Sequence, residues 1–272
     1  MTKEKDSKMT ISESLEVGRA LRSIPLERAP RSLLPAVLSR IGLADGYWEI
    51  DSPVGRIFVA HSKAGISLVS RARSAADFEK TFRARYGRPI GPSTDAPPAN
   101  VKSLVAGRVR GRDANVRFDL RGVSEFERAV LLKALEIPPG EVRPYSWIAR
   151  EIGHPDAVRA AGSALAKNPV PLLIPCHRVV RSDGHIGNYS LGGPRNKRTL
   201  LAAEGADPRM LEKLAAAGVR YLGNEQGRFY CFPTCGGLES LIRDNQVRFG
   251  SSREAQAAGF RPCAECRPAA VA

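Results

Sequence analysis

Four of the five cysteines in this chain fall within its last 42 residues, as two close pairs. Three residues separate Cys231 from Cys235, two separate Cys263 from Cys266, and 27 lie between the pairs. Two close pairs joined by one loop are the usual layout of a tetrahedral zinc site with four thiolate ligands. The alternative, two disulfides, requires an oxidising compartment. The spacing therefore predicts a small module held by zinc over residues 218–272.

Composition and charge narrow the class of protein. A chain of 272 residues is long enough for two or three domains with ordinary hydrophobic cores. Its charged start lacks the apolar stretch of a signal peptide, and no apolar run approaches the ~20 residues of a membrane span, so we expect a cytoplasmic protein. The net charge of +14 suits a polyanion. Without a basic amphipathic anchor, nucleic acid is favoured over membrane, and a generally basic surface is the simpler alternative.

The first half of the chain predicts an N-terminal extension, 1–45, and a small mixed α/β domain, 46–121. The extension has the spacing of one short helix within 23–45. From Tyr47 apolar and polar residues alternate, with turn signals near Pro53 and Gly65, which predicts an antiparallel meander. The expected elements of this domain are strands over 47–70, a helix at 75–87, a loop at 87–100, a helix at 99–107 and a strand at 115–120.

Residues 122–205 predict a mainly helical domain. It opens with Ser124 and Glu127, which have the spacing of a capping box at the start of a helix. Further helices are expected at 194–204 and 208–217, and the second of these leads into the C-terminal module.

A helix-turn-helix is expected in the middle of this domain. PYSWIAREIG and a helix at 157–167 flank a turn that contains Gly153, with Asp156 as the expected N-cap of the second helix. Arg159 projects from the start of this helix, whose small residues allow a close approach to another surface. They are Ala160, Ala161, Gly162, Ser163 and Ala164. The sequence does not distinguish a helix that approaches a partner from one that packs closely on its own protein.

The remaining cysteine follows an apolar run, 171–174, and leads directly into a histidine and an arginine. A thiol is a good nucleophile only as a thiolate, and a neighbouring base or positive charge lowers its pKa. Cys176, His177 and Arg178 therefore form a candidate reactive group. An inert cysteine in an apolar core is the alternative. Pro175 before the cysteine and the polar, glycine-bearing segment after it favour an exposed edge.

Five motifs together resemble one family. They are PYSWIA (144–149), AVRAAGSAL with NP (157–165 and 168–169), IPCHRVV (174–180), GNY (187–189) and LLAAE (200–204). With the predicted strands, they make residues 46–205 resemble the O6-alkylguanine-DNA alkyltransferases, also called methylated-DNA–protein-cysteine methyltransferases. The resemblance implies an α/β, RNase H-like N-terminal unit and a mainly α, winged-helix-like catalytic domain with a helix-turn-helix.

The resemblance also implies a DNA repair reaction. Cys176 would accept a methyl or larger alkyl group from O6-alkylguanine, and from O4-alkylthymine, in DNA. His177 would take the thiol proton through a water, and Glu204 would orient and stabilise His177. Asn168 would brace the turn that holds these residues. Because a thioether is stable, each molecule would act once, as a monomer and without a cofactor for the transfer.

The implied partner is double-stranded DNA bound through the minor groove. Ala160 and Gly162 would let the second helix sit deep, and Arg159 would replace the extruded guanine in the base stack. Tyr145 would turn the backbone and donate a hydrogen bond to the leaving guanine. The substrate pocket would be covered and lined by Asn188, Tyr189, Ser190 and Val179. Leu131, where the family often has a tryptophan, and one extra residue in YSLGGPRNK leave the preferred alkyl size open.

The C-terminal stretches FYCFPTCGG and VRFGSSREAQAAGFRPCAECRP resemble the metal-binding domain of Ada. In Ada the first of the four cysteines also accepts methyl groups from DNA phosphotriesters, so Cys231 is a candidate second acceptor. Where that family has arginines after the second cysteine, this chain has Gly236, Gly237 and Leu238, which weakens phosphate contacts. A structural zinc is therefore the favoured interpretation.

Two alternative functions are weighed against repair. A non-catalytic protein that binds alkylated DNA would lack the acceptor, whereas this chain keeps Cys176. An Ada-like sensor would use methylation of Cys231 to switch its DNA affinity, but no separate regulatory helix-turn-helix is evident between the two modules.

Overall fold

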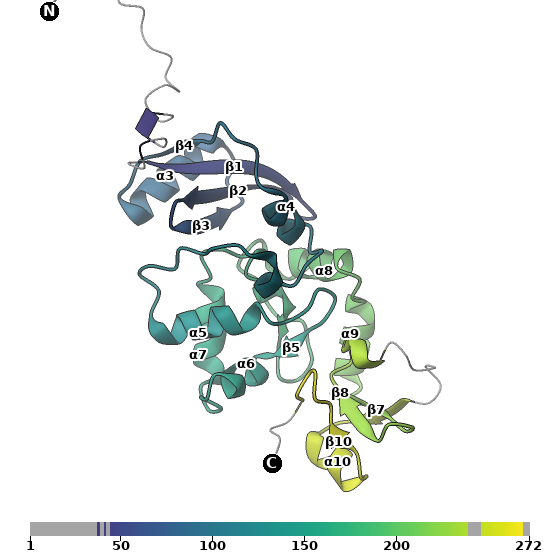
Figure 1. The fold of residues 1–272 in the computed structure, drawn as a ribbon. Coiled ribbons are helices and arrows are strands. Elements are labelled where there is room, and N and C mark those ends of the chain that lie inside the picture. Colours follow the sequence, from purple (N-terminus) through teal and green to yellow (C-terminus); the bar gives the residue numbers. More distant parts are fainter. Residues whose placement is uncertain (1–36, 39–40, 42–43, 239–245, 269–272) are drawn as a thin grey trace, which may run out of the picture.

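The computed structural model describes residues 37–38, 41, 44–238 and 246–268. They form three successive parts: a sheet with helix α3, a helical middle part and a small C-terminal part (Figure 1). Within these ranges, no helix has the length and apolar character needed to cross a membrane. Most of the short helix expected within 23–45 lies outside the described residues, although residues 37 and 38 are helical.

The N-terminal sheet has the strand order β3-β2-β1-β4. Its strands are β1 (Asp45–Ser52), β2 (Gly55–Ser62), β3 (Gly65–Ser70) and β4 (Ile90–Pro92). The first three form the predicted antiparallel meander, and β4 pairs parallel to β1. Side chains of β2 alternate between two apolar faces: Phe58 and Ala60 pack with α3 (Ala75–Tyr86), whereas Ile57 and Val59 join the main core.

Two predicted elements of this part are wrong. The expected loop at 87–100 contains β4, because Ile90 is buried and pairs with Asp45, a contact that local glycines and prolines do not reveal. The expected strand at 115–120 is only an isolated bridge between Phe118 and Ile66. The predicted helix between them is present as α4, and a short 3-10 helix follows it. Their bounds are Ala99–Val105 for α4 and Gly111–Ala114 for η1.

The middle part contains the predicted helix-turn-helix, α6 and α7. Its helices are α5 (Glu125–Ala134), α6 (Tyr145–Glu151), α7 (Val158–Ala166), α8 (Gly193–Ala203) and α9 (Pro208–Ala216). The capping box of Ser124 and Glu127 is confirmed at the start of α5. The predicted N-cap Asp156 is wrong: Ala157 occupies that position, because its N–H closes a turn on the His154 carbonyl and the helix begins one residue later.

A short two-stranded sheet connects the cysteine segment to the helix-turn-helix. The 3-10 helix η2 (Cys176–Arg178) continues into β6 (Val179–Val180), which pairs parallel with β5 (Arg143–Pro144). Because β5 runs directly into Tyr145 at the start of α6, this pairing fixes the cysteine turn relative to that helix.

The C-terminal part packs on the middle part. Its elements are β7 (Tyr221–Asn224), β8 (Phe229–Cys231), η3 (Gly236–Leu238), β9 (Gln246–Phe249), α10 (Ser252–Ala257) and β10 (Arg261–Pro262). Four strands form a sheet in the order β10-β8-β7-β9. One apolar cluster contains Ile57 of the first sheet, Trp147 of α6 and Cys266. This cluster therefore runs through all three parts.

Candidate active site and metal site

Cys176 lies inside the protein at the end of the apolar run. Every residue from 171 to 180 is buried, and Cys176 is 5 % exposed. The predicted exposed edge is therefore wrong, because the polar segment that follows folds back: the ring centre of Tyr189 lies 6.0 Å from that of His177. Leu172 has a left-handed backbone with a φ of 79°, a strained conformation for leucine that turns the chain just before the cysteine.

Asn168 contacts both the backbone of this turn and the sulfur. Its Nδ2 donates to the Ile174 carbonyl at 2.9 Å and lies 3.2 Å from Cys176 Sγ. Its Oδ1 accepts from the Val170 N–H at 3.0 Å. Asn168 is itself buried, so the loss of one partner would leave a polar group unsatisfied in a low dielectric. The amide therefore holds the cysteine turn in a single arrangement.

His177, Arg178 and Glu204 form a buried charged cluster. His177 Nε2 lies 2.8 Å from Glu204 Oε1, and Arg178 donates to both carboxylate oxygens, from Nη2 at 2.8 Å and from Nε at 2.9 Å. Arg178 also donates to the Ile137 carbonyl at 2.7 Å. None of the three side chains is more than 5 % exposed. Helix α8 thus brings to His177 a carboxylate that lies 27 residues later in the chain.

The cluster sets the protonation of His177. Burial raises the pKa of Glu204, but His177 and Arg178 outweigh that effect and lower it from 4.5 to about 2. Burial lowers the pKa of His177 below 6.5, against the opposing effect of Glu204. His177 is therefore neutral at pH 7, with its proton on Nε2 facing the carboxylate and a lone pair on Nδ1. Within the described residues, the buried Nδ1 has no hydrogen-bond partner.

The positive charge that acts on the thiol comes from Lys197. Burial raises the pKa of the Cys176 thiol above 9.0, while Asn168 and Lys197 act in the opposite direction. Lys197 is fully buried and donates to the carbonyls of Val179 at 2.6 Å and Asn188 at 3.3 Å, and burial lowers its pKa to about 8. Arg178 is next to the site in sequence but points to Glu204.

The helix-turn-helix presents the residues predicted for DNA. Arg159 and Ala160 are exposed on α7, and Gly162 is half-buried. A Cβ added to Gly162 would lie 3.9 Å from the ring of Tyr145, an ordinary contact distance. Tyr145 is partly buried, and its ring centre lies 6.0 Å from Lys197 Nζ. Lys197 therefore lies between the residues of this face and the cysteine turn.

The predicted pocket residues differ in burial and in how they take part in the site. Tyr189 is buried beside His177, with its ring edge-on to the imidazole. Ser190, the next residue, is partly open to solvent, but its side chain interacts with the Cys176 thiol and lowers the thiol pKa, whereas Asn188 is exposed. Val179 is fully buried, and its carbonyl, rather than its side chain, takes part in the site by accepting from Lys197.

The four C-terminal cysteines meet at one point. Their sulfur atoms all lie within 4.8 Å of one another, and all four are free thiols. Four thiolates at this separation fit a tetrahedral Zn²⁺ with Zn–S distances of about 2.3 Å. Cys231 is 0 % exposed. In this arrangement its sulfur is not accessible to a DNA phosphate.

The metal site is built against helix α6. The indole N–H of Trp147 donates to the carbonyl of Cys266 at 3.0 Å. The guanidinium of Arg267 lies 5.7 Å from the Trp147 ring centre and forms an ion pair with Glu151 at 2.8 Å. The backbone around the cysteines is therefore bonded directly to the first helix of the helix-turn-helix.

A second line of contacts lies at β5. The N–H of Val142 donates to Thr234 Oγ1 at 2.8 Å, and the N–H of Gly236 donates to Glu141 Oε1 at 3.1 Å. Thr234 and Gly236 flank Cys235, so this side of the cysteine cluster is also bonded to the middle part. The two lines of contact restrict rotation of the C-terminal part against α6.

Sequence reasoning missed three residues of these sites. Arg178 stands in a quoted motif, but its contact with Glu204 was not expected. Lys197 carries no local signal, since a lysine at the start of a helix is normally exposed. Trp147 also stands in a quoted motif, but the carbonyl it binds lies 119 residues away.

Two family models match this chain. The model described as the DNA-binding domain of 6-O-methylguanine DNA methyltransferase matches residues 125–206. The model described as the metal-binding domain of Ada matches residues 211–269. The first range contains the cysteine turn and the helix-turn-helix, and the second contains the four-cysteine cluster.

Curated relatives and solved structures are similar to the same regions. The methylated-DNA–protein-cysteine methyltransferase of Rattus norvegicus is 56 % identical over 81 residues, which span 29 % of this chain and only 39 % of the rat protein. The protein of the same name from Mycolicibacterium paratuberculosis is 34 % identical over 158 residues, 58 % of this chain and 91 % of the relative. A crystal structure of Mycobacterium tuberculosis OGT in complex with DNA is 31 % identical and covers 61 % of this chain and 98 % of its own, with a TM-score of 0.47.

The mycobacterial relative is matched over nearly its whole length, and the residues of the cysteine turn lie together in the structure. The chain belongs to the methylated-DNA–protein-cysteine methyltransferase family, and it carries an Ada-type metal-binding module behind the methyltransferase region.

Proposed function

We propose that this chain repairs DNA by moving a methyl or larger alkyl group from O6 of guanine to Sγ of Cys176. The observation that carries the proposal is a buried cysteine next to a neutral His177, whose Nδ1 has no partner among the described residues and whose Nε2 is held by Glu204. A nucleophile, a base and an orienting carboxylate are what this transfer needs. O4-alkylthymine in DNA is the second proposed substrate.

The proposed reaction balances within the site. The bond from Sγ to the alkyl carbon forms as the bond from O6 to that carbon breaks. The thiol proton passes to His177 Nδ1 through a water, and Glu204 stabilises the imidazolium that results. The guanine leaves as an anion, to which the Tyr145 hydroxyl donates a hydrogen bond, and it takes one proton from water while the imidazolium returns its proton to water. The thioether product is stable, so each molecule acts once, and no cofactor takes part in the transfer.

The proposed DNA complex places α7 in the minor groove of a duplex. Ala160 and Gly162 have little or no side chain, which allows the helix to approach closely. Arg159 is exposed at the start of α7 and is free to fill the gap in the base stack when the alkylated guanine is turned out. The net charge of +14 supports a polyanionic partner. We propose that the protein acts as a monomer.

We propose the same four segments as the sequence predicts. They are an extension at 1–45, an RNase H-like unit at 46–121, a winged-helix-like catalytic domain at 122–205 and a zinc module at 218–272. The antiparallel meander with β4 parallel to β1 supports the second segment. The α6–α7 pair beside the β5–β6 sheet supports the third.

The zinc would be held by Cys231, Cys235, Cys263 and Cys266. Bound there, it would cross-link four points of the small module and contribute folding free energy. We propose that this site is structural. The complete burial of Cys231 and its position in the same core as Trp147 support a structural site over a second methyl acceptor.

Peptide-mapped mass spectrometry tests both proposals at once. The full chain, loaded with zinc, is incubated with duplex DNA that carries O6-methylguanine and methylphosphotriesters. We expect one methyl group, on Cys176, and none in the Cys176→Ala variant. A methyl on Cys231 would overturn the structural assignment of the metal site. A folded, DNA-bound protein without a methyl on Cys176 would leave a non-catalytic DNA-binding protein as the function.

A further inference from the structure

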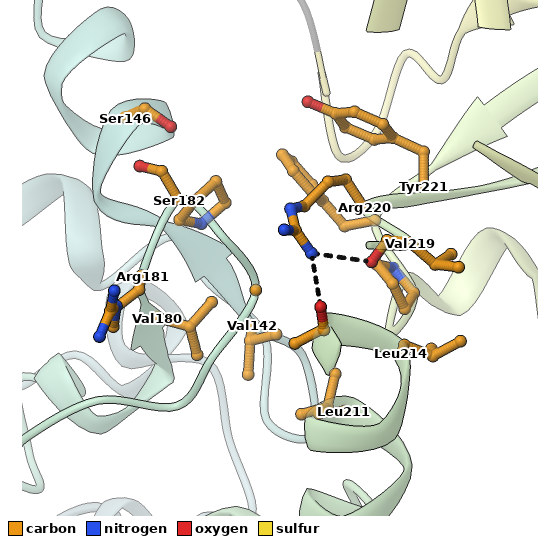
Figure 2. Close-up of a pocket in the computed structure, with 15 residues that line it drawn as sticks. Val142, Ser146, Val180, Arg181, Ser182, Leu211, Leu214, Val219, Arg220 and Tyr221 are labelled. Carbon is orange, nitrogen blue, oxygen red and sulfur yellow. Dashed lines mark hydrogen bonds between the residues drawn. The ribbon is translucent and has the colours of Figure 1, made fainter. Parts of the chain in front are cut away.

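A pocket that the proposed reaction does not use lies where the C-terminal part meets the helix-turn-helix (Figure 2). This junction pocket has a cavity volume of about 60 Å³. One wall comes from α6 and the segment after β6, and the other comes from α9, β7 and the segment after β8. The polar side chains that line it are Ser146, Arg181, Ser182, Arg220 and Tyr221. The residues that line it include no aspartate or glutamate, so both charged groups in its lining are positive.

Arg220 is the charged group of this pocket that has no counter-ion among the described residues. Its Nη1 donates to the carbonyls of Ala215 at 3.2 Å and Val219 at 3.4 Å, as Figure 2 shows. Its half-buried guanidinium forms no ion pair within the described residues, whereas Arg181 pairs with Asp183 at 2.6 Å. A charge that is partly removed from water is normally paired. The remaining N–H groups of Arg220 are therefore available to an anion.

The segment after β6, in the wall opposite Arg220, is a tight turn that comes close to the Arg220 guanidinium. The N–H of Gly184 donates to the Arg181 carbonyl at 2.9 Å, which places Ser182 at the tip of the turn. Gly184 has a φ of 84°, and a Cβ added there would lie 3.4 Å from Arg220 Nη1. Figure 2 shows Ser182 and Ser146 on one side of the pocket, and Arg220 with Tyr221 on the other.

One residue that lines the junction pocket is the sequence neighbour of a residue proposed to contact DNA. Ser146 follows Tyr145 directly, in the first turn of α6. When the second helix of a helix-turn-helix enters a groove, the first helix crosses the sugar–phosphate backbone. The side of α6 that carries Ser146 therefore lies beside phosphates when α7 is in the groove.

Resting on the proposed function, we propose that the junction pocket binds the phosphate backbone beside the alkylated base. Arg220 supplies the charged contact, and the hydroxyls of Ser146 and Ser182 supply hydrogen bonds. The C-terminal module is then part of the DNA-binding surface. Its bonds to α6, such as that from Trp147 to Cys266, hold Arg220 in place before DNA arrives, which lowers the entropic cost of the contact.

Fluorescence anisotropy with undamaged duplex DNA over a salt series tests the proposal on the full chain. Arg220→Gln should weaken binding about tenfold at low salt and reduce the slope of log affinity against log salt by about one, as expected for one lost phosphate contact. Arg220→Lys keeps the charge and should retain most of the slope. Arg248→Gln is the matched control, because Arg248 is exposed on β9 of the same sheet and does not line the pocket.

A second variant leaves Arg220 unchanged, together with the hydrogen bonds that it donates to the backbone at the end of α9. Ser182→Asp places a carboxylate opposite Arg220 and should weaken DNA binding at least as much, while its melting temperature and zinc content stay those of the wild type. Both variants should react with the free base O6-methylguanine, which has no phosphate, at the wild-type rate.

Several outcomes would overturn the proposal. One is an affinity and salt slope for Arg220→Gln and Ser182→Asp that equal those of Arg248→Gln. Another is a result in which Arg220→Gln weakens the binding of inorganic phosphate but leaves the DNA affinity unchanged. That result would assign the pocket to a free anion. Failure of the proposed function would look different, because Cys176 of the wild type would then stay unmethylated.

Discussion

Replacing Glu204 by glutamine removes a buried charge and leaves the shape nearly unchanged. Oε1 accepts from His177 and Arg178, and Oε2 accepts from Arg178, so an amide nitrogen at either position would face a donor. The pKa of Glu204 is lowered from 4.5 to about 2. At about 1.4 kcal/mol per pKa unit, this difference corresponds to about 3 kcal/mol of stability. This value agrees with the cost of removing one partner of a buried ion pair, which is typically about 3–5 kcal/mol.

The effect should depend on pH in a defined direction. Because the pKa of Glu204 in the folded protein is depressed, its contribution is complete above the ordinary value of 4.5 and is lost as the pH falls toward about 2. Denaturant unfolding followed by circular dichroism should therefore show Glu204→Gln less stable by about 3 kcal/mol at neutral pH, with a smaller difference near pH 3. The rate of methyl transfer to Cys176 should fall by about 100-fold or more, since His177 loses the group that orients it.

Glu212→Gln is the matched control. Glu212 also contacts a histidine and an arginine, His185 at 2.6 Å and Arg198 at 3.2 Å, but its side chain is 29 % exposed. A partly exposed pair of this kind contributes less than about 1 kcal/mol. Two results would contradict this role of Glu204: an equal loss of stability in the two variants, or a loss in Glu204→Gln that does not become smaller at low pH. In either case Glu204 is not a buried charged partner that prepares His177 to act as a base.

Three further predictions follow from the contacts described above. Zinc removal by a chelator should lower the melting temperature and shift the fluorescence of Trp147 to longer wavelength, because the backbone around the cysteines loses its cross-link. An unchanged fluorescence spectrum would contradict the docking of the metal site on α6. Arg159→Ala should slow repair of duplex DNA about tenfold or more while leaving the melting temperature unchanged, since Arg159 is exposed; equal rates in a single-turnover assay would remove it from the DNA interface. Lys197→Met should react more slowly than the wild type below about pH 8, because Lys197 is charged there and lowers the pKa of Cys176. The difference between the two reaction rates should become smaller above that pH. A ratio of the two rates that stays constant across pH would refute this role.

Local patterns in the sequence predicted much of the fold. The alternation from Tyr47 to Ser70 predicted the meander, and the spacing of Ser124 and Glu127 predicted the cap of α5. These predictions succeed because strand alternation and helix capping depend on residues a few positions apart. β4 was missed because its pairing depends on β1, more than 40 residues earlier.

Residue chemistry and spacing nominated the reactive cysteine with its histidine and the four cysteines of the metal site. A thiol followed by an imidazole, and four thiols in two close pairs, restrict the chemistry before any fold is known. The structure then brings Cys176 within reach of Asn168, joins His177 to Glu204 and gathers the four sulfur atoms.

The electrostatics of the cysteine turn were decided only by the tertiary structure. The sequence favoured an exposed thiol with Arg178 beside it, whereas the folded chain buries Cys176, turns Arg178 to Glu204 and brings Lys197 toward the sulfur from another helix. Burial and charge separation depend on which distant segments pack together, and they control the pKa of every group in the site.

The sequence by itself determined that the chain carries a nucleophilic cysteine segment, a helix-turn-helix and a four-thiol metal site, because each is a local arrangement of residue types. Only the tertiary structure decided that the C-terminal part docks on α6 and forms the junction pocket with it, since the bond from Trp147 to Cys266 and the pocket around Arg220 join segments that are far apart in the chain.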